Sequence, residues 1–386
     1  MHIPPVTREV DTELKAFETA VFNDQTQFHA FVNAIGRTVD VVAEAFWPVN
    51  KHIHENPELA YEEFIAHDTL TSFMKGIDGW SVVSSAYGMK TAWVATFSLP
   101  GPGSVVSFNA EMAGGGKIRL LEAGAYSDHK VDISLISHPS KGTDAAQTFT
   151  STNISYTAEY FGREAHAAAN PWLGINALDG LISAYNSISM LRQQTMPGDL
   201  IQGHITNGGA RPNIIHANAA GRFVVRSGSV KRAEEVGKKV YDCLESGALA
   251  SSAKVSITTK QGYKNHIPNR PLARSYARYF NALNPPSSIS ANQDIDAARG
   301  RSSASTDQGN ISHVIPSISP YFSIPTGPTG QGPHNPEFAT TAGTKSAYDR
   351  ALRVAKALAG TAIDVLVSKD FLDEVKKDWQ CSIQRE

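Results

Sequence analysis

Three histidines at strand ends and in loops are the side chains of this 386-residue chain best placed to do chemistry. His138 directly follows the apolar run 131–137, and α/β folds present ligands at the carboxyl ends of their strands. His334 follows the Gly/Pro-rich segment 327–333, and His166 lies between a predicted strand and a predicted helix. Each alone is also typical of an ordinary polar loop residue, but together they indicate metal binding or proton transfer.

Three common catalytic motifs are incomplete or absent in this sequence. Gly114-Gly115-Gly116-Lys117 resembles a phosphate loop, but the upstream glycine is missing and Ile118 stands where Ser or Thr is required. Glu58 occupies the place of the second histidine of an HExxH zinc motif that begins at His54. No G-x-S-x-G elbow is present. A P-loop enzyme and a serine hydrolase are therefore disfavoured.

Composition narrows the class of partner and compartment. The net charge is −2 and no basic run with interleaved aromatics occurs, so we expect no nucleic acid partner. The chain has two cysteines and no CxxC pair, which excludes a disulfide framework and a thiolate zinc knuckle. No window approaches the roughly 20 apolar residues of a membrane helix, and the N-terminus carries no apolar signal region. We expect no membrane association and a cytoplasmic location.

Hydrophobic periodicity predicts an α/β fold of two domains. Residues 1–150 and 261–386 read as the two parts of one α/β catalytic domain with a mixed sheet. Residues 151–260 read as an inserted ferredoxin-like domain with the order β-α-β-β-α-β. Its predicted elements are a strand at 153–161, a helix at 172–194, strands at 200–206 and 218–226, a helix at 230–245 and a strand at 254–259.

Several motifs in combination resemble the aminoacylase/carnosinase family of zinc exopeptidases, peptidase family M20, and its dipeptidase-like branch. The resemblance runs from about residue 40 to 367. The family's fold is an α/β catalytic domain with an inserted ferredoxin-like lid that also forms a homodimer, which agrees with the periodicity. The motifs are His52-Ile53-His54-Glu55-Asn56-Pro57-Glu58-Leu59, Gly162-Arg163-Glu164-Ala165-His166-Ala167, Arg211-Pro212-Asn213-Ile214-Ile215, Ser305-Thr306-Asp307 and Gly332-Pro333-His334-Asn335-Pro336-Glu337-Phe338.

This resemblance assigns roles to individual residues. It implies two zinc ions that activate water for hydrolysis of small dipeptides or N-acyl amino acids, with a glutamate as general base. His138 and His334 match metal ligands of the family. His166 resembles the lid histidine that stabilises the tetrahedral oxyanion in the partner subunit. Asn213, with Arg211 in the same motif, matches the substrate-binding loop.

The chain departs from the family at one join. Strand-like residues 105–111 run directly into the glycines 114–116 and a predicted helix at 117–126. The family has here a long segment with a Cys-Gly-His ligand motif and a Glu-Glu pair that supplies one base and one ligand. Glu111 is the remaining candidate for a third ligand or the base. His216 also stands where the family has proline.

Loss of these groups predicts a hydrolase with little activity and weak or absent zinc binding, because a hydrolytic zinc keeps three protein ligands and an open position. Deleting a strand and its crossover helix from a parallel sheet is also expected to expose apolar neighbours and leave a strand edge unpaired. Two alternatives remain open. One is a catalytically dead homolog that acts as a dimeric peptide-binding protein; the other is an incomplete gene model of an active dipeptidase.

Overall fold

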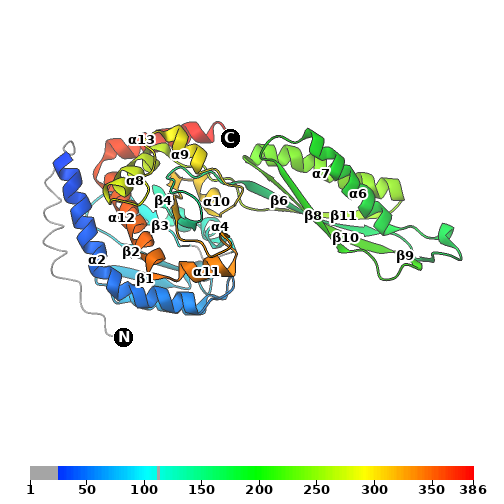
Figure 1. The fold of residues 1–386 in the computed structure, drawn as a ribbon, viewed down its shortest axis with the longest axis horizontal. Coiled ribbons are helices and arrows are strands. Elements are labelled where there is room, and N and C mark those ends of the chain that lie inside the picture. Colours follow the sequence, from blue (N-terminus) through cyan, green and yellow to red (C-terminus); the bar gives the residue numbers. More distant parts are fainter. Residues whose placement is uncertain (1–24, 111–113) are drawn as a thin grey trace. The chain divides into compact units, whose positions relative to one another are not determined.

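The computed structural model describes residues 25–110 and 114–386, and these residues form two compact units (Figure 1). Unit 1 contains the chain through Thr148 together with Ile267–Arg301 and Ile311–Arg385. Unit 2 contains Phe149–His266, Ser302–Asn310 and the terminal Glu386. In the described part of the chain, no helix is both long and apolar enough to cross a membrane.

Unit 2 has the predicted β-α-β-β-α-β order. All strand pairs of its four-stranded sheet are antiparallel, and the strands lie in the order β11-β6-β10-β8. The first and last strands of the unit, β6 and β11, therefore pair with each other. This is the arrangement of a ferredoxin-like domain. The elements are β6 (Thr152–Phe161), α6 (Ala177–Leu191), β8 (Leu200–Asn207), β10 (Asn218–Ser227), α7 (Val230–Ser251) and β11 (Lys254–Gln261).

The core of unit 2 follows from alternation in β6. Ile154, Tyr156, Ala158 and Tyr160 are buried, and the residues between them are more exposed, as expected for a strand with one face on a hydrophobic core. The helices α6 and α7 pack on this face. A short antiparallel ribbon of β7 (Ala165–His166) and β9 (Ile214–Ile215) and the turns η2 (Pro171–Leu173) and η3 (Arg192–Gln194) complete the unit.

Helix α7 extends to Ser251, six residues beyond the predicted end at 245. The added segment includes Gly247, which packs on Gly180 of α6. A Cβ atom placed on Gly247 would lie 2.2 Å from the carbonyl oxygen of Gly180, a distance that no side chain tolerates. The two glycines therefore let the helix backbones touch, and this tertiary contact outweighs the low helix propensity of glycine. The helix ends at Ser252, whose φ of 57° is left-handed.

Unit 1 has several small sheets instead of one long one. The strand order in its parallel sheet is β12-β4-β3, and a second parallel pair joins β5 to β13. The strands β1 and β2 form a separate antiparallel hairpin. The strands are β1 (Trp80–Ser84), β2 (Trp93–Phe97), β3 (Val106–Phe108), β4 (Ile133–Leu135), β5 (His138–Ser140), β12 (Ser317–Ile318) and β13 (Tyr321–Ser323).

Helices from both ends of the chain cover the strands of unit 1. A buried carboxylate joins two of them: Asp364 of α12 accepts hydrogen bonds from Ser275 Oγ at 2.7 Å and Tyr279 Oη at 2.9 Å, both on α8. The helices are α2 (Gln25–Glu55), α3 (Phe64–Lys75), α4 (Gly116–Glu122), α5 (Ala125–Asp128), α8 (Arg270–Ala282), α9 (Gln293–Arg299), α11 (Pro336–Ala342), α12 (Lys345–Val367) and α13 (Lys369–Ile383), with the 3₁₀ turn η1 (Ala86–Gly88); α10 (Gln308–Ser312) crosses the unit boundary in sequence.

One predicted helix of unit 1 is wrong in detail. The segment 117–126 forms two short helices, α4 and α5, instead of one. Gly124 separates them with a φ of +89°, a left-handed conformation that glycine adopts at little cost and that ends an α-helix. The strand β3 before this region pairs only with β4 among the described strands, and its Phe108 side chain is 57% exposed.

Candidate functional site

The first predicted metal ligand, His138, begins β5 in unit 1. Its strand lies parallel to β13, with His138 opposite Tyr321. The ring is half-buried, and Nδ1 lies 2.9 Å from the hydroxyl oxygen of Ser319. This contact holds the ring from one side.

The second predicted ligand, His334, is exposed and has a positive φ of 69°. A carboxylate fixes the loop in front of it: Glu337 Oε2 accepts hydrogen bonds from the backbone amide of Thr329 at 3.0 Å and from its hydroxyl at 2.7 Å. These bonds hold the pKa of Glu337 below its ordinary value. Asn335 caps α11 by accepting from the amide of Glu337. The loop that carries His334 is therefore anchored at both ends.

The chain segments that carry the two histidines come together at one end of β5. The amide of Ile324, which follows β13, donates to the carbonyl oxygen of Ser140 at 3.0 Å. Lys141 Nζ lies 3.4 Å from the carbonyl oxygen of Gly330, in the loop before His334. Sequence reasoning therefore placed both histidines in segments that are neighbours in unit 1.

The described residues do not complete a metal site. Glu111, the third predicted ligand and candidate base, lies outside the described residues. Within residues 25–110 and 114–386, no group of three or more His, Cys, Asp or Glu side chains is arranged to hold a metal ion. Two histidines fall short of the three protein ligands of a hydrolytic zinc, so these residues do not fit a zinc pair.

In unit 2 the predicted oxyanion donor and substrate residue share one ribbon. His166 of β7 pairs with Ile214 of β9, and the amide of Ala167 donates to the carbonyl oxygen of Asn213 at 3.0 Å. The side chains of His166, Asn213 and Arg211 are all exposed. The structure thus brings His166 close to the segment that carries Arg211 and Asn213, although more than 40 positions separate them in sequence.

The imidazole of His166 has a defined tautomer. Its Nδ1 lies 3.2 Å from the amide nitrogen of Ala168 and 3.1 Å from that of Ala169. Because both amides donate, Nδ1 is an acceptor, and the neutral ring carries its proton on Nε2. The Nε2–H group of this exposed residue is then a hydrogen-bond donor. This is the form of histidine that can stabilise an oxyanion.

Two other sequence features have structural roles. The hydroxyl of Thr306 accepts from the amide of Gln308 at 3.2 Å, which is the local helix-start contact expected for Ser305-Thr306-Asp307. His216, which departs from the family's proline, accepts the amide of Ala177 through its carbonyl oxygen at 2.8 Å. A proline keeps this carbonyl, so the substitution does not remove the contact.

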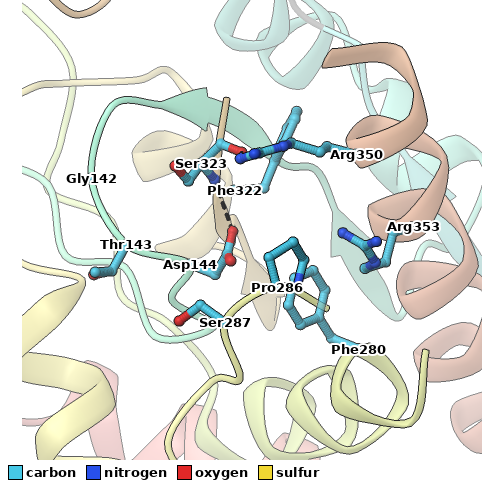
Figure 2. Close-up of a pocket in the computed structure, with 10 residues that line it drawn as sticks. All are labelled: Gly142, Thr143, Asp144, Phe280, Pro286, Ser287, Phe322, Ser323, Arg350 and Arg353. Carbon is cyan, nitrogen blue, oxygen red and sulfur yellow. Dashed lines mark hydrogen bonds between the residues drawn. The ribbon is translucent and has the colours of Figure 1, made fainter. Parts of the chain in front are cut away.

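Sequence reasoning missed one polar cavity in unit 1. Its charged side chains are Asp144, Arg350 and Arg353 (Figure 2). None of the predicted site residues lines it. The two arginines are three positions apart on α12 and so share a helix face, but about 200 positions separate them from Asp144. No spacing in the sequence joins residues so distant.

Comparison with known proteins finds relatives across nearly the whole chain. The Xaa-Arg dipeptidase of Mus musculus is 33% identical over 407 residues, with 90% of this chain and 92% of that protein covered. Since 90% of 386 residues is about 347, about 60 of the 407 aligned positions have no residue in this chain. No protein-family model matches the chain.

Solved structures share the fold at low sequence identity. A protein described as an aminohydrolase from methicillin-resistant Staphylococcus aureus has a TM-score of 0.68 and 13% identity, and the match covers 88% of this chain and 98% of that one. A Bacillus subtilis protein described as a dinuclear metal binding peptidase from the M20 family has a TM-score of 0.59 and 12% identity, with 85% and 100% covered. These likenesses concern the fold alone.

Proposed function

Because the chain belongs to the M20 peptidase family, we propose that it derives from a metal-dependent hydrolase of amide bonds in small dipeptides or N-acyl amino acids. We propose further that the chain as it stands is impaired in catalysis and binds zinc weakly or not at all. The single observation that carries the proposal is a contrast between the two units. The predicted substrate-binding residues lie close together in unit 2, whereas the set of predicted metal ligands in unit 1 is incomplete among the described residues.

The arrangement of the predicted substrate-binding residues in unit 2 supports descent from an amide hydrolase. His166 presents an Nε2–H donor whose orientation is set by two backbone amides, and Asn213, which directly precedes the paired strand β9, accepts the amide of Ala167. A donor held in place before substrate binds loses little entropy at the transition state. Such a preorganised group serves amide hydrolysis, in which the carbonyl oxygen gains negative charge. In a protein that only bound peptide, this orientation would give no such advantage.

The incomplete set of metal ligands in unit 1 supports the proposed loss of hydrolytic activity. Only His138 and His334 are described among the ligands expected from the family resemblance. The roughly 60 aligned positions without a residue here are enough for the segment that carries the Cys-Gly-His motif and the Glu-Glu pair. Loss of a positioned general base commonly costs about 10²–10⁴-fold in rate. We derive no catalytic step through zinc for this chain.

Relatives suggest the substrate class more closely. The mouse and human relatives, 33% and 31% identical, are named Xaa-Arg dipeptidases. A dipeptide with a carboxyl-terminal arginine is therefore the first substrate to test. Asn213 and Arg211 are the proposed contacts for its carboxylate end, because amide and guanidinium groups donate hydrogen bonds to carboxylates.

The exposed edge of unit 2 supports the proposed homodimer. Among the described strands, β8 pairs only with β10, and seven of its eight residues are exposed. An unpaired edge strand of this length is a template for pairing with another chain. The family resemblance implies that, in such a homodimer, the lid histidine, here His166, acts in the partner subunit.

The test uses the purified full-length chain. Metal content would be measured by mass spectrometry after dialysis against zinc, and hydrolysis of an Xaa-Arg dipeptide by chromatography, with the mouse relative as the positive control. We expect fewer than two metal ions per chain and hydrolysis at least about 10²-fold slower than that of the relative. Two bound metals with comparable turnover would refute the impairment.

The two open alternatives give different results. A dead homolog that binds peptides would form a stable metal-free dimer and bind the dipeptide without cleaving it. An incomplete gene model would show itself in the transcript, where extra codons would lie between those for Glu111 and Gly114. Reading the transcript across this join therefore shows whether the protein itself lacks the segment or whether the gene model omits it.

A further inference from the structure

A cavity of about 200 Å³ lies in unit 1, apart from the predicted ligands and outside the proposed catalytic role. Its residues come from the loop Gly142–Asp144, the end of α8, β13 and α12. Figure 2 shows Asp144 on one side, Arg350 and Arg353 extending from α12 on the other, and an aromatic ring between them.

The walls of the cavity are partly apolar. Phe280 and Phe322 are 2% and 8% exposed, so both rings are held firmly by the core behind them. Pro286 adds a third apolar surface and is exposed. A cavity of about 150 Å³ is known to accommodate benzene. The space here therefore suits one flat ring with a small polar group attached.

The charged groups of the cavity differ in the hydrogen bonds that they make. Arg350 Nη1 donates to the carbonyl oxygen of Ser323 at 2.7 Å, and Asp144 Oδ1 accepts from the amide of the same residue at 2.8 Å. Arg353 is half-buried, and it makes no hydrogen bond or ion pair with any residue that the structure describes. One backbone unit thus engages Arg350 and Asp144, and Arg353 keeps its donors for another group.

The balance of charge favours an anion. The cavity contains two guanidinium groups, which stay protonated, and one carboxyl group. Burial raises the pKa of Asp144, although the Ser323 amide and the two arginines oppose this effect. A half-buried cation without a partner costs free energy, and a carboxylate offers the planar, bidentate acceptor that a guanidinium prefers.

We propose that this cavity is a binding site for a small aromatic carboxylate of about the size of benzoate. The carboxylate bonds to Arg353, and the ring packs against Phe280 and Phe322. A phosphate ion would satisfy Arg353 but would leave the apolar walls uncovered, so the ring is part of the recognition. The site does not depend on zinc or on turnover.

The experiment is calorimetric titration of the full-length chain with benzoate, benzamide and inorganic phosphate. Benzamide has the ring without the charge, and phosphate has the charge without the ring. Two variants address the cavity: Arg353→Gln removes the charge, and Ser287→Trp places a large ring at an exposed lining position. Arg211→Gln tests the competing carboxylate site, since it removes the same charge from the exposed substrate loop of unit 2. Arg222→Gln is the matched control, since it removes the charge of an exposed residue of β10 that has no proposed role in binding. Thermal melts check that each variant is folded.

We expect saturable binding of benzoate, at least about tenfold weaker binding of benzamide and phosphate, and at least about tenfold weaker benzoate binding in both cavity variants. Arg211→Gln and Arg222→Gln should bind benzoate as the unmodified chain does. The proposal is overturned if benzoate does not saturate the chain, if benzamide or phosphate binds equally well, or if folded cavity variants retain full affinity. Loss of binding in Arg211→Gln alone would place benzoate in the substrate loop and would equally overturn it.

Discussion

The central strands of unit 2 are eight to ten residues long, whereas the parallel strands of unit 1 are two or three residues long and fall into separate sheets. Both units begin from similar apolar runs in the sequence. In the described part of the chain, the edge strands β8 and β11 of unit 2 pair along seven and eight residues of their neighbours, whereas the edge strand β3 of unit 1 pairs with β4 over three. The length of a strand therefore follows the length of the neighbour it pairs with in both units.

This difference has a counterpart at the surface. Large apolar side chains are exposed on the antiparallel hairpin of β1 and β2 and on β3. Of these strands only β3 belongs to the parallel sheet, which is normally covered on both faces. Since β3 directly precedes the join, the exposed edge lies where the family resemblance predicts a missing segment. The exposed side chains are Trp80 at 39%, Val83 at 54%, Phe97 at 45% and Phe108 at 57%.

The largest effect is expected from restoring to unit 1 the segment that the family resemblance predicts to be missing at the join. Inserting into the join between Glu111 and Gly114 the segment that the mouse relative has at the corresponding place should restore the missing ligands and base. We expect two metal ions per chain and hydrolysis of an Xaa-Arg dipeptide raised by at least about 10²-fold. A Gly/Ser linker of equal length is the control. A folded graft without bound metal would show that the loss lies elsewhere.

The second effect concerns a buried ion pair of unit 2. Asp199, 2% exposed, accepts from Arg232 Nη2 at 2.7 Å and from the amide of Met196 at 2.8 Å. Asp199→Ala removes the buried partner of Arg232, which keeps its ion pair with Glu235 at 3.0 Å, so we expect a loss of about 1–3 kcal/mol in the free energy of unfolding. Urea denaturation would measure it. The exposed pair of Lys238 and Asp242 is the control, and Asp242→Ala should cost no more than about 1 kcal/mol.

The same pair makes stability depend on pH. Burial alone would raise the pKa of Asp199, but bonds from Arg232, Met196 and Ser227 outweigh it, and the folded-state pKa lies below the ordinary 3.8. The stabilisation is therefore complete above the unfolded-state value and is lost as pH falls through the lower folded-state pKa. Asp199→Ala should lack this component, and equal acid sensitivity of the two proteins would contradict the assignment.

The third effect concerns association rather than stability. Phe108→Thr keeps a residue that favours strands and removes an exposed ring from the edge strand β3. We expect less self-association by light scattering, with the free energy of unfolding changed by no more than about 0.5 kcal/mol. Phe161→Thr is the matched control, because Phe161 is 44% exposed but lies on β6, which pairs on both sides. Equal effects of both variants would mean that ring exposure alone, and not the unpaired edge, drives association.

The smallest effect concerns the loop before His334. Bonds from Thr329 hold the pKa of Glu337 below 4.5, so they stabilise the loop above that pH and are lost as pH falls through the lower folded-state pKa. Carbon-detected NMR would give the pKa directly. In Thr329→Val the hydroxyl bond is gone and the pKa should move back toward 4.5. An unchanged pKa would show that the hydroxyl does not hold this carboxylate.

Local pattern predicted unit 2 well because its information is local. Alternation in 153–161 and the helical stripe in 172–194 both became elements of the fold, since each has one face on a core. In unit 1 the break at Gly124 depends on one backbone angle, and helical periodicity does not reveal it. Tertiary contact, as at Gly180 and Gly247, also moved an element boundary beyond what propensity indicates.

The candidate site was predictable only in part. Motif resemblance selected His166 and Asn213, and the structure then showed them on one ribbon. The tautomer of His166 could not be foreseen, because it depends on two backbone amides that its own loop turns toward the ring. The cavity around Arg353 could not be foreseen either, since its walls come from separate segments spread between residues 142 and 353 of the chain.

The contact between Gly180 and Gly247 constrains how this helix pair can evolve. A Cβ atom at either position would collide with the facing helix, at 2.2 Å from a carbonyl oxygen in one case and 2.6 Å from a serine hydroxyl in the other. Substitutions on the outer surfaces of α6 and α7 face no such limit. A side chain at either position would therefore force the two helix axes apart.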